Sequence, residues 1–185
     1  MKVLLINGSP HEKGCTYTAL SLIAGELKAQ GIETEILHVG GQPVGGCIGC
    51  GGCAKGNGCV FGGVVNEAIE KAKTADGFVF GSPVHYASAS GNMASFMDRL
   101  AYAGGKYLAY KPAAICCSAR RAGTTSTLDQ LVKYPQFFHM PLVNGSYWAM
   151  VHGSNPEQVL QDAEGCAVMQ ELGRNMAWLL RCIEA

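Results

Sequence analysis

The sequence predicts a single α/β domain over residues 1–185, with a doubly wound, five-stranded parallel sheet in the order 2-1-3-4-5 and helices on both faces. Short continuous apolar runs, typical of strands buried on both faces, alternate along the chain with helical patterns. Because parallel strands need crossover connections, this alternation favours one parallel sheet. Ligands of such sheets bind beyond the carboxyl ends of the strands.

Each expected element has its own sequence pattern. Apolar runs place strands at residues 2–7, 32–39, 77–81 and 113–118, and a fifth strand beginning at Leu142. Helical spacing follows at residues 18–30, 64–73, 90–100 and 125–138. A last helix is expected from Pro156 towards Cys182, with Asn155 as its N-cap.

The composition disfavours several classes of partner. Lys+Arg and Asp+Glu both number 14, so a net charge of zero gives no attraction to nucleic acid or to an anionic membrane. No apolar run approaches the ~18 residues that cross a bilayer, and no secretion signal precedes the first strand. Nine cysteines without an export signal indicate reduced thiols in the cytoplasm.

A glycine-rich loop at residues 45–63, inserted after the second strand, carries the most informative motif. Cys47, Cys50, Cys53 and Cys59 have the spacing C-x2-C-x2-C-x5-C. Glycine permits the positive φ values of tight turns and leaves backbone N–H groups free to face sulfur. Four thiolates in one short run favour a [4Fe–4S] cluster. A zinc site usually splits its thiolates into two distant pairs and is disfavoured; free or oxidised thiols are the other alternative.

The turn after the first strand suits a phosphate group. Its hydroxyl and charged side chains lie just before a helix N-terminus, whose free N–H groups bind anions. The turn matches neither the Walker A motif nor the G-x-G-x-x-G dinucleotide-binding motif. An ordinary β–α turn is the alternative. The cysteine in this turn has either a depressed pKa or a small side chain that fits. The candidate binding residues are Ser9, His11, Gly14, Cys15 and Thr16.

The turn after the third strand could flank a flat heterocycle, although a packed turn is the alternative. Its candidates are Ser82, Pro83, Val84, His85 and Tyr86.

The turn after the fourth strand carries two arginines, which could stabilise an anionic flavin edge or hold a nicotinamide phosphate. A solvated basic loop is the alternative. Its candidates are Ser118, Arg120, Arg121 and Gly123. No carboxylate pair or G-x-S-x-G elbow stands out, so no catalytic acid or base is assigned and a hydrolase is disfavoured.

Together these motifs resemble the iron–sulfur flavoproteins, which belong to the NADPH-dependent FMN reductase group of flavodoxin-like proteins. The resemblance covers nearly the whole chain, in family order. It rests on Gly8-Ser9-Pro10, the four cysteines, Gly81-Ser82-Pro83-Val84-His85-Tyr86, Met97-Asp98-Arg99, Arg120-Arg121-Ala122-Gly123-Thr124-Thr125, and Tyr147-Trp148 with His152-Gly153. This chain departs from the family at His85, where Tyr is frequent, at Ala87, where Gly is frequent, and at Cys15, where Asn is frequent.

The resemblance implies a flavodoxin-like fold that binds FMN, with the phosphate on residues 9–16 and the ring near residues 83–86 and 118–123. In cluster-bearing members the four cysteines hold a [4Fe–4S] cluster close to FMN, whereas other members work from NAD(P)H without a cluster. A homodimer or homotetramer is also implied.

The expected function is an FMN-dependent oxidoreductase that moves electrons from NAD(P)H or a ferredoxin-like donor to a small acceptor such as a quinone, oxygen or flavin. One alternative is a flavodoxin-type electron carrier, although such carriers steer to partners with an acidic face that a neutral chain lacks. The other alternative is a thiol-based redox sensor.

Overall fold

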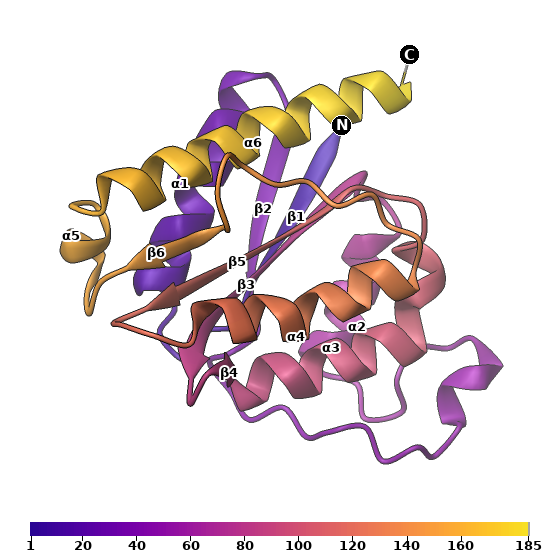
Figure 1. Cartoon of the computed structure of the whole chain (residues 1–185). Helices are drawn as coiled ribbons and strands as arrows, with labels where there is room; N and C mark the ends of the chain where they lie inside the picture. The colour runs from indigo at the N-terminus through magenta and orange to yellow at the C-terminus, as the bar shows by residue number, and fades with distance from the viewer. Residues whose placement is uncertain (185) are drawn as a thin grey trace.

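A mainly parallel sheet forms the centre of the molecule in the computed structural model, which describes residues 1–184 (Figure 1). The strands follow the order β2-β1-β3-β5-β6, and the short β4 pairs with β3 in antiparallel orientation. Numbered without β4, this is the predicted order 2-1-3-4-5, so the predicted fold class is confirmed. The strands are β1 (Lys2–Asn7), β2 (Glu33–His38), β3 (Gly77–His85), β4 (Ser88–Ala89), β5 (Ala113–Ala119) and β6 (Met150–His152).

Helices cover both faces of the sheet, because successive strand residues point to opposite sides (Figure 1). Val3 and Leu5 of β1 belong to the core that packs beneath α1 and α6. Leu4 and Ile6 belong to the core on the other face, beneath α2 and α3. The longer helices are α1 (Cys15–Ala29), α2 (Val64–Ala72), α3 (Gly91–Gly104), α4 (Thr124–Phe137) and α6 (Ala163–Glu184), and α5 (Pro156–Val159) is a single turn.

The fifth parallel strand does not begin at Leu142, so that prediction was wrong. Leu142 makes only an isolated bridge to Ala113, and β6 forms at Met150–His152. The chain leaves the sheet edge in between, where Gly145 lies so close to α6 that a Cβ atom would stand 3.0 Å from the Val168 carbonyl oxygen. This detour towards α6 delays the strand.

The last helix is divided into two, contrary to the continuous helix predicted. The predicted cap is present, since Asn155 Oδ1 accepts a hydrogen bond from Gln158 N at 2.9 Å. The helix that follows is only α5, however, and Asp162 then starts α6 by accepting from Gly165 N at 3.0 Å. The other Asp162 oxygen accepts from His152 N at 2.8 Å, so a contact with β6 fixes the break.

The packing of α1 against α6 gives a test of the fold. A Cβ atom on Gly173 would stand 2.8 Å from the Ile23 carbonyl oxygen, whereas Gly25 of α1 has open space around it. We expect Gly173→Ala to lower the free energy of unfolding by about 1–3 kcal/mol through overpacking. The control Gly25→Ala should raise it by up to about 1 kcal/mol through helix propensity. Urea denaturation followed by circular dichroism measures both, and stabilisation by both substitutions would contradict the helix contact.

Candidate functional site

The turns that follow β1, β3 and β5 meet at the carboxyl edge of the sheet, and we call residues 8–16, 83–87 and 118–123 the rim. Gly8 N donates to the Gly81 carbonyl at 2.9 Å, which joins the first turn to β3. Thr16 Oγ1 lies 2.8 Å from Ser118 Oγ, a buried hydrogen bond between positions 102 residues apart in the sequence. The three turns predicted to share one edge therefore do so.

The first turn is held by its own hydrogen bonds. Ser9 N donates to Asn7 Oδ1 at 3.1 Å, and Asn7 Nδ2 donates to the Glu12 carbonyl at 2.9 Å. His11 N donates to Ser9 Oγ at 3.1 Å, while the His11 side chain is exposed. Because Gly14 caps α1 without a side chain, no side-chain oxygen occupies the first N–H groups of that helix. Those groups remain available to an anion at the rim.

Cys15 and Thr16 lie in the first turn of α1, which begins earlier than the predicted residue 18. The Cys15 thiol donates to the Gly153 carbonyl at 3.5 Å. Burial raises the pKa of Cys15, against the alternative of a depressed pKa at a helix N-terminus. Cys15 is therefore a protonated side chain that fits the loop and contacts the end of β6.

The second turn is a hairpin between β3 and β4 rather than a simple strand end. His85 pairs with Ser88, and the two residues between them, Tyr86 (φ 51°) and Ala87 (φ 59°), both have left-handed backbone conformations. Glycine tolerates this conformation without strain, which accounts for the Gly that is frequent at this position in the family pattern, whereas Ala87 adopts the same conformation with a side chain. His85 and Tyr86 are exposed at the tip, and the Tyr86 side chain has no protein cover.

Ser82 lies below the rim rather than on it. Its hydroxyl accepts from Ser90 N at 3.0 Å and donates to the Pro83 carbonyl at 2.9 Å, and the side chain is fully buried. The structure therefore places Ser82 as a support for the start of α3, beneath the Pro83–Tyr86 turn.

The third turn brings positive charge against the hairpin. Arg120 and Arg121 are exposed, and within residues 1–184 neither forms an ion pair with a carboxylate. Gly123 has φ 99°, and a Cβ atom there would stand 2.9 Å from Ala87 Cα. Only glycine allows this approach, so Gly123 brings the third turn into contact with the second.

The cysteine loop lies along α3, one side of which it follows from start to end (Figure 1). Asn92 in the first turn of α3 donates to the Gly40 and Gln42 carbonyls at 3.0 Å and accepts from Val44 N at 3.1 Å. The loop itself turns at six glycines with positive φ, as its composition predicted. These are Gly49, Gly51, Gly56, Gly58, Gly62 and Gly63.

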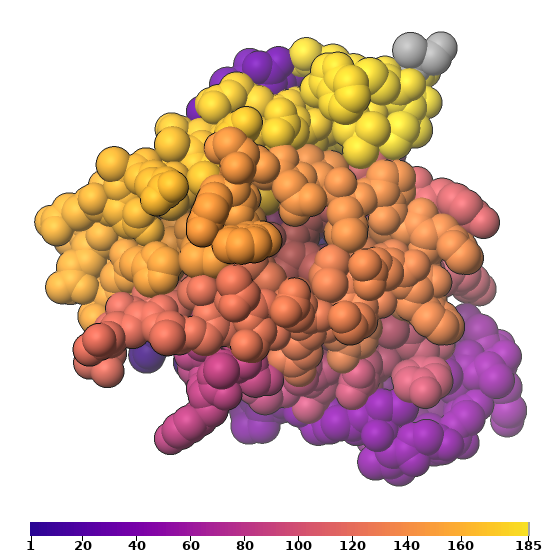
Figure 2. Space-filling model, in the orientation of Figure 1, coloured from indigo at the N-terminus to yellow at the C-terminus, as the bar shows by residue number. Residues whose placement is uncertain are grey.

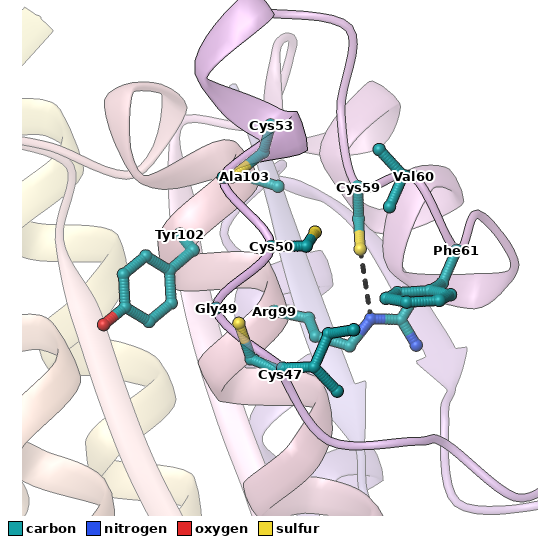
Figure 3. Close-up of a pocket in the computed structure, with 12 residues that line it drawn as sticks. Cys47, Gly49, Cys50, Cys53, Cys59, Val60, Phe61, Arg99, Tyr102 and Ala103 are labelled. Carbon is teal, nitrogen blue, oxygen red and sulfur yellow. Dashed lines mark hydrogen bonds between the residues drawn. The ribbon is translucent and has the colours of Figure 1, made fainter.

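The four cysteines of this loop line one hollow of about 120 Å³, which we call the cysteine pocket. Figure 3 shows their sulfur atoms around the hollow, with Arg99 and Tyr102 of α3 beside them. Cys47 and Cys50 are exposed, whereas Cys53 and Cys59 are half-buried.

Cys59 is the most firmly held of the four. Its backbone N donates to Asn66 Oδ1 at 2.8 Å, and Asn66 Nδ2 donates to its carbonyl at 3.0 Å. Its sulfur accepts a hydrogen bond from Arg99 Nε at 3.2 Å (Figure 3).

The donor set suits a four-iron cluster better than a single ion. Zinc needs four ligand atoms at about 2.0–2.3 Å from the ion. Among the residues described, no three His, Cys, Asp or Glu side chains come close enough together to bind one metal ion. A [4Fe–4S] cluster takes one thiolate per iron, so its cysteines must surround a volume. Four thiols around one hollow meet that requirement.

The cysteine pocket and the rim lie at opposite ends of α3. Ser90 caps the helix at the rim, and Arg99 follows it by nine residues, or about 13 Å along the axis. In Figure 2 the cysteine loop and the β3–β4 turn project from the molecule at separate places. The four thiols of one chain are therefore separated from its own rim by a stretch of α3.

The sequence patterns did not predict the role of several residues that hold these sites together. Asn7, Asn66 and Asn92 each bond to the backbone of a loop, and Arg99 contacts a cysteine. A polar side chain in the first turn of an amphipathic helix was the available signal for Asn66 and Asn92.

No helix in the described part of the chain is long and apolar enough to cross a membrane.

Several known proteins are similar to this chain in sequence. An iron–sulfur flavoprotein of Methanocaldococcus jannaschii is 28% identical over 192 residues, which cover 100% of both chains. One from Methanosarcina thermophila is 23% identical and covers 100% of this chain and 97% of that protein. One from Archaeoglobus fulgidus is 36% identical over 99 residues, or 54% of this chain and 48% of that protein.

Solved structures share the fold at low sequence identity. RosB with a bound 8-demethyl-8-formylriboflavin-5'-phosphate has a TM-score of 0.78 at 14% identity, covering 100% of this chain and 80% of that one. An NADH:FMN oxidoreductase has a TM-score of 0.71 at 16% identity, covering 96% and 89%. A flavodoxin from the domain Archaea has a TM-score of 0.59 at 12% identity, covering 94% and 99%, so the fold is flavodoxin-like.

The family follows from a match that includes all three turns of the rim and the whole cysteine loop. The model of the family described as NADPH-dependent FMN reductase matches residues 1–155. This protein therefore belongs to the NADPH-dependent FMN reductase family of flavin-dependent oxidoreductases, with iron–sulfur flavoproteins among its full-length relatives.

Proposed function

We propose that this protein is an FMN-dependent oxidoreductase that takes electrons from NAD(P)H or a ferredoxin-like donor and passes them to a small acceptor such as a quinone, oxygen or flavin. The observation that carries the proposal is the joining of three turns at the carboxyl edge of the sheet, through Thr16 with Ser118 and Gly123 with Ala87. A doubly wound sheet binds its ligand at this edge, and membership of the family supports FMN as that ligand.

Each turn would contribute a different interaction with FMN. The first N–H groups of α1 would bind the phosphate, since no side chain caps them. The exposed turn at Pro83–Tyr86 would flank the ring, and Arg120 and Arg121 would stabilise negative charge at its edge. When bound, FMN supplies the electron chemistry, while the protein binds it, orients it and tunes its potential.

The cysteine pocket would hold a [4Fe–4S] cluster through Cys47, Cys50, Cys53 and Cys59. The arrangement of these four thiols around one hollow supports this assignment, as do the full-length relatives named iron–sulfur flavoproteins. When bound, the cluster supplies single-electron transfer. Thiols of this kind require a reducing compartment, which supports a cytoplasmic location.

Assembly into a homodimer or homotetramer is part of the same proposal. Large apolar side chains are exposed around the cysteine pocket, and subunit contacts are one way to cover them. These are Ile48, Val60, Phe61 and Tyr102, all more than half exposed.

Steady-state turnover tests the proposal and separates an enzyme from an electron carrier. The full chain is purified without oxygen and assayed with NAD(P)H or a reduced ferredoxin as donor and a quinone as acceptor. Multiple turnovers with either donor are expected, and the donor that works identifies the branch. A chain that binds FMN but turns over with neither donor would contradict the enzyme and favour a carrier.

The contact at Gly123 predicts the FMN affinity of a variant. In Gly123→Ala the new Cβ atom would meet Ala87 Cα, a backbone atom, so the two turns must separate. We expect the Kd for FMN to rise about tenfold, equivalent to about 1.4 kcal/mol. Quenching of flavin fluorescence measures the Kd, and Gly25→Ala on the exterior of α1 is the control with unchanged affinity. Wild-type affinity in Gly123→Ala would argue against joint binding by these two turns.

The cysteine assignment predicts iron content. Cys59→Ala removes a thiol that Asn66 holds in place at the pocket, so iron after anaerobic reconstitution should fall from about four per chain to well below one. FMN content should stay at the wild-type level. Cys166→Ala, which changes a half-buried cysteine of α6, should keep wild-type iron. Undiminished iron in Cys59→Ala would rule out this residue as a ligand.

A further inference from the structure

Arg99 is a buried arginine whose surroundings do not explain its charge. Only 6% of the residue is exposed, and the guanidinium is always protonated. Within residues 1–184, no carboxylate pairs with it. A buried charge is costly without a partner of opposite sign. Arg99 therefore needs a nearby anion that is not a carboxylate side chain.

The groups that Arg99 does contact lie at the cysteine pocket. Nη2 donates to the Gly62 carbonyl at 2.9 Å, and Nη1 donates to the Gly45 carbonyl at 3.4 Å. Nε donates to Cys59 Sγ at 3.2 Å, and the guanidinium stands 5.7 Å from the centre of the Phe61 ring. Among these partners, the sulfur is the one that can carry a full negative charge.

These contacts also join the two ends of the cysteine loop. Gly45 precedes Cys47 and Gly62 follows Cys59, so one side chain of α3 holds both the entry and the exit of the loop. Figure 3 shows Arg99 extending from α3 to the side of the hollow where Cys59 lies. The charge of Arg99 is therefore fixed in position beside the four sulfurs.

We propose that Arg99 raises the reduction potential of the cluster in the cysteine pocket, as a positioning residue that acts through the Cys59 thiolate. This inference rests on the proposed function, since it requires a cluster at the four cysteines. A thiolate-ligated cluster carries net negative charge, which grows when it accepts an electron. A hydrogen bond and a nearby cation stabilise the more negative state more strongly, and both factors set cluster potentials.

The test is a redox titration of the reconstituted full chain, followed by electron paramagnetic resonance of the reduced cluster. In Arg99→Gln we expect electron binding to weaken at least tenfold, which lowers a one-electron midpoint potential by at least about 59 mV. Arg99→Lys keeps the charge but loses the planar fork, so its potential should fall by a smaller amount. Arg174→Gln, on the exposed side of α6, should titrate as wild type.

Iron content distinguishes the possible failures. If the wild type takes up no iron, both the cluster assignment and the inference fall. If the wild type holds a cluster and both Arg99 variants titrate at the wild-type potential, the role of Arg99 is overturned while the proposed function stands. If Arg99→Gln retains no iron, Arg99→Lys decides: a lowered potential supports the inference, and an unchanged potential overturns it.

Discussion

The buried hydrogen bond between Thr16 and Ser118 is the contact on which the candidate flavin site depends. It joins the first turn of α1 to the end of β5, although β3 lies between β1 and β5 in the sheet. The close approach of Gly123 to Ala87 then adds the β3–β4 hairpin to the same edge. Three turns that are far apart in the sequence thereby form one rim, with uncapped N–H groups on one side and two exposed arginines on another.

The cysteine pocket is built by different physical means. Its loop has no regular partner strand, so side chains from two helices hold the backbone. Asn66 binds Cys59, Arg99 binds Gly45 and Gly62 at the two ends of the loop, and Asn92 binds the segment just before it. Glycines supply the left-handed turns, and the helices supply the fixed points. The cysteine pocket is therefore held in position by α2 and α3, whereas the rim is held by the strand ends. Helix α3 connects the two sites, with Ser90 at one end and Arg99 towards the other.

Periodicity and turn chemistry predicted the main features because they are local properties of the chain. Apolar runs located the first four parallel strands, and the positions of the polar turns located the rim. The late start of β6 and the division of the last helix were not predictable in this way, because Gly145 packing against α6 and Asp162 bonding to His152 are tertiary contacts. Arg99 was missed as a site residue for the same reason: its partners lie 37 to 54 residues away in the sequence.

Hydrogen–deuterium exchange with and without FMN tests the central claim most directly, because it reports each turn of the rim separately. If the three turns form one binding site, FMN should slow exchange together in peptides that cover residues 9–16, 83–87 and 118–123, with the cysteine loop at residues 45–63 unaffected by FMN alone. Protection of a single turn, or protection confined to the cysteine loop, would contradict a joint flavin site at the carboxyl edge of the sheet.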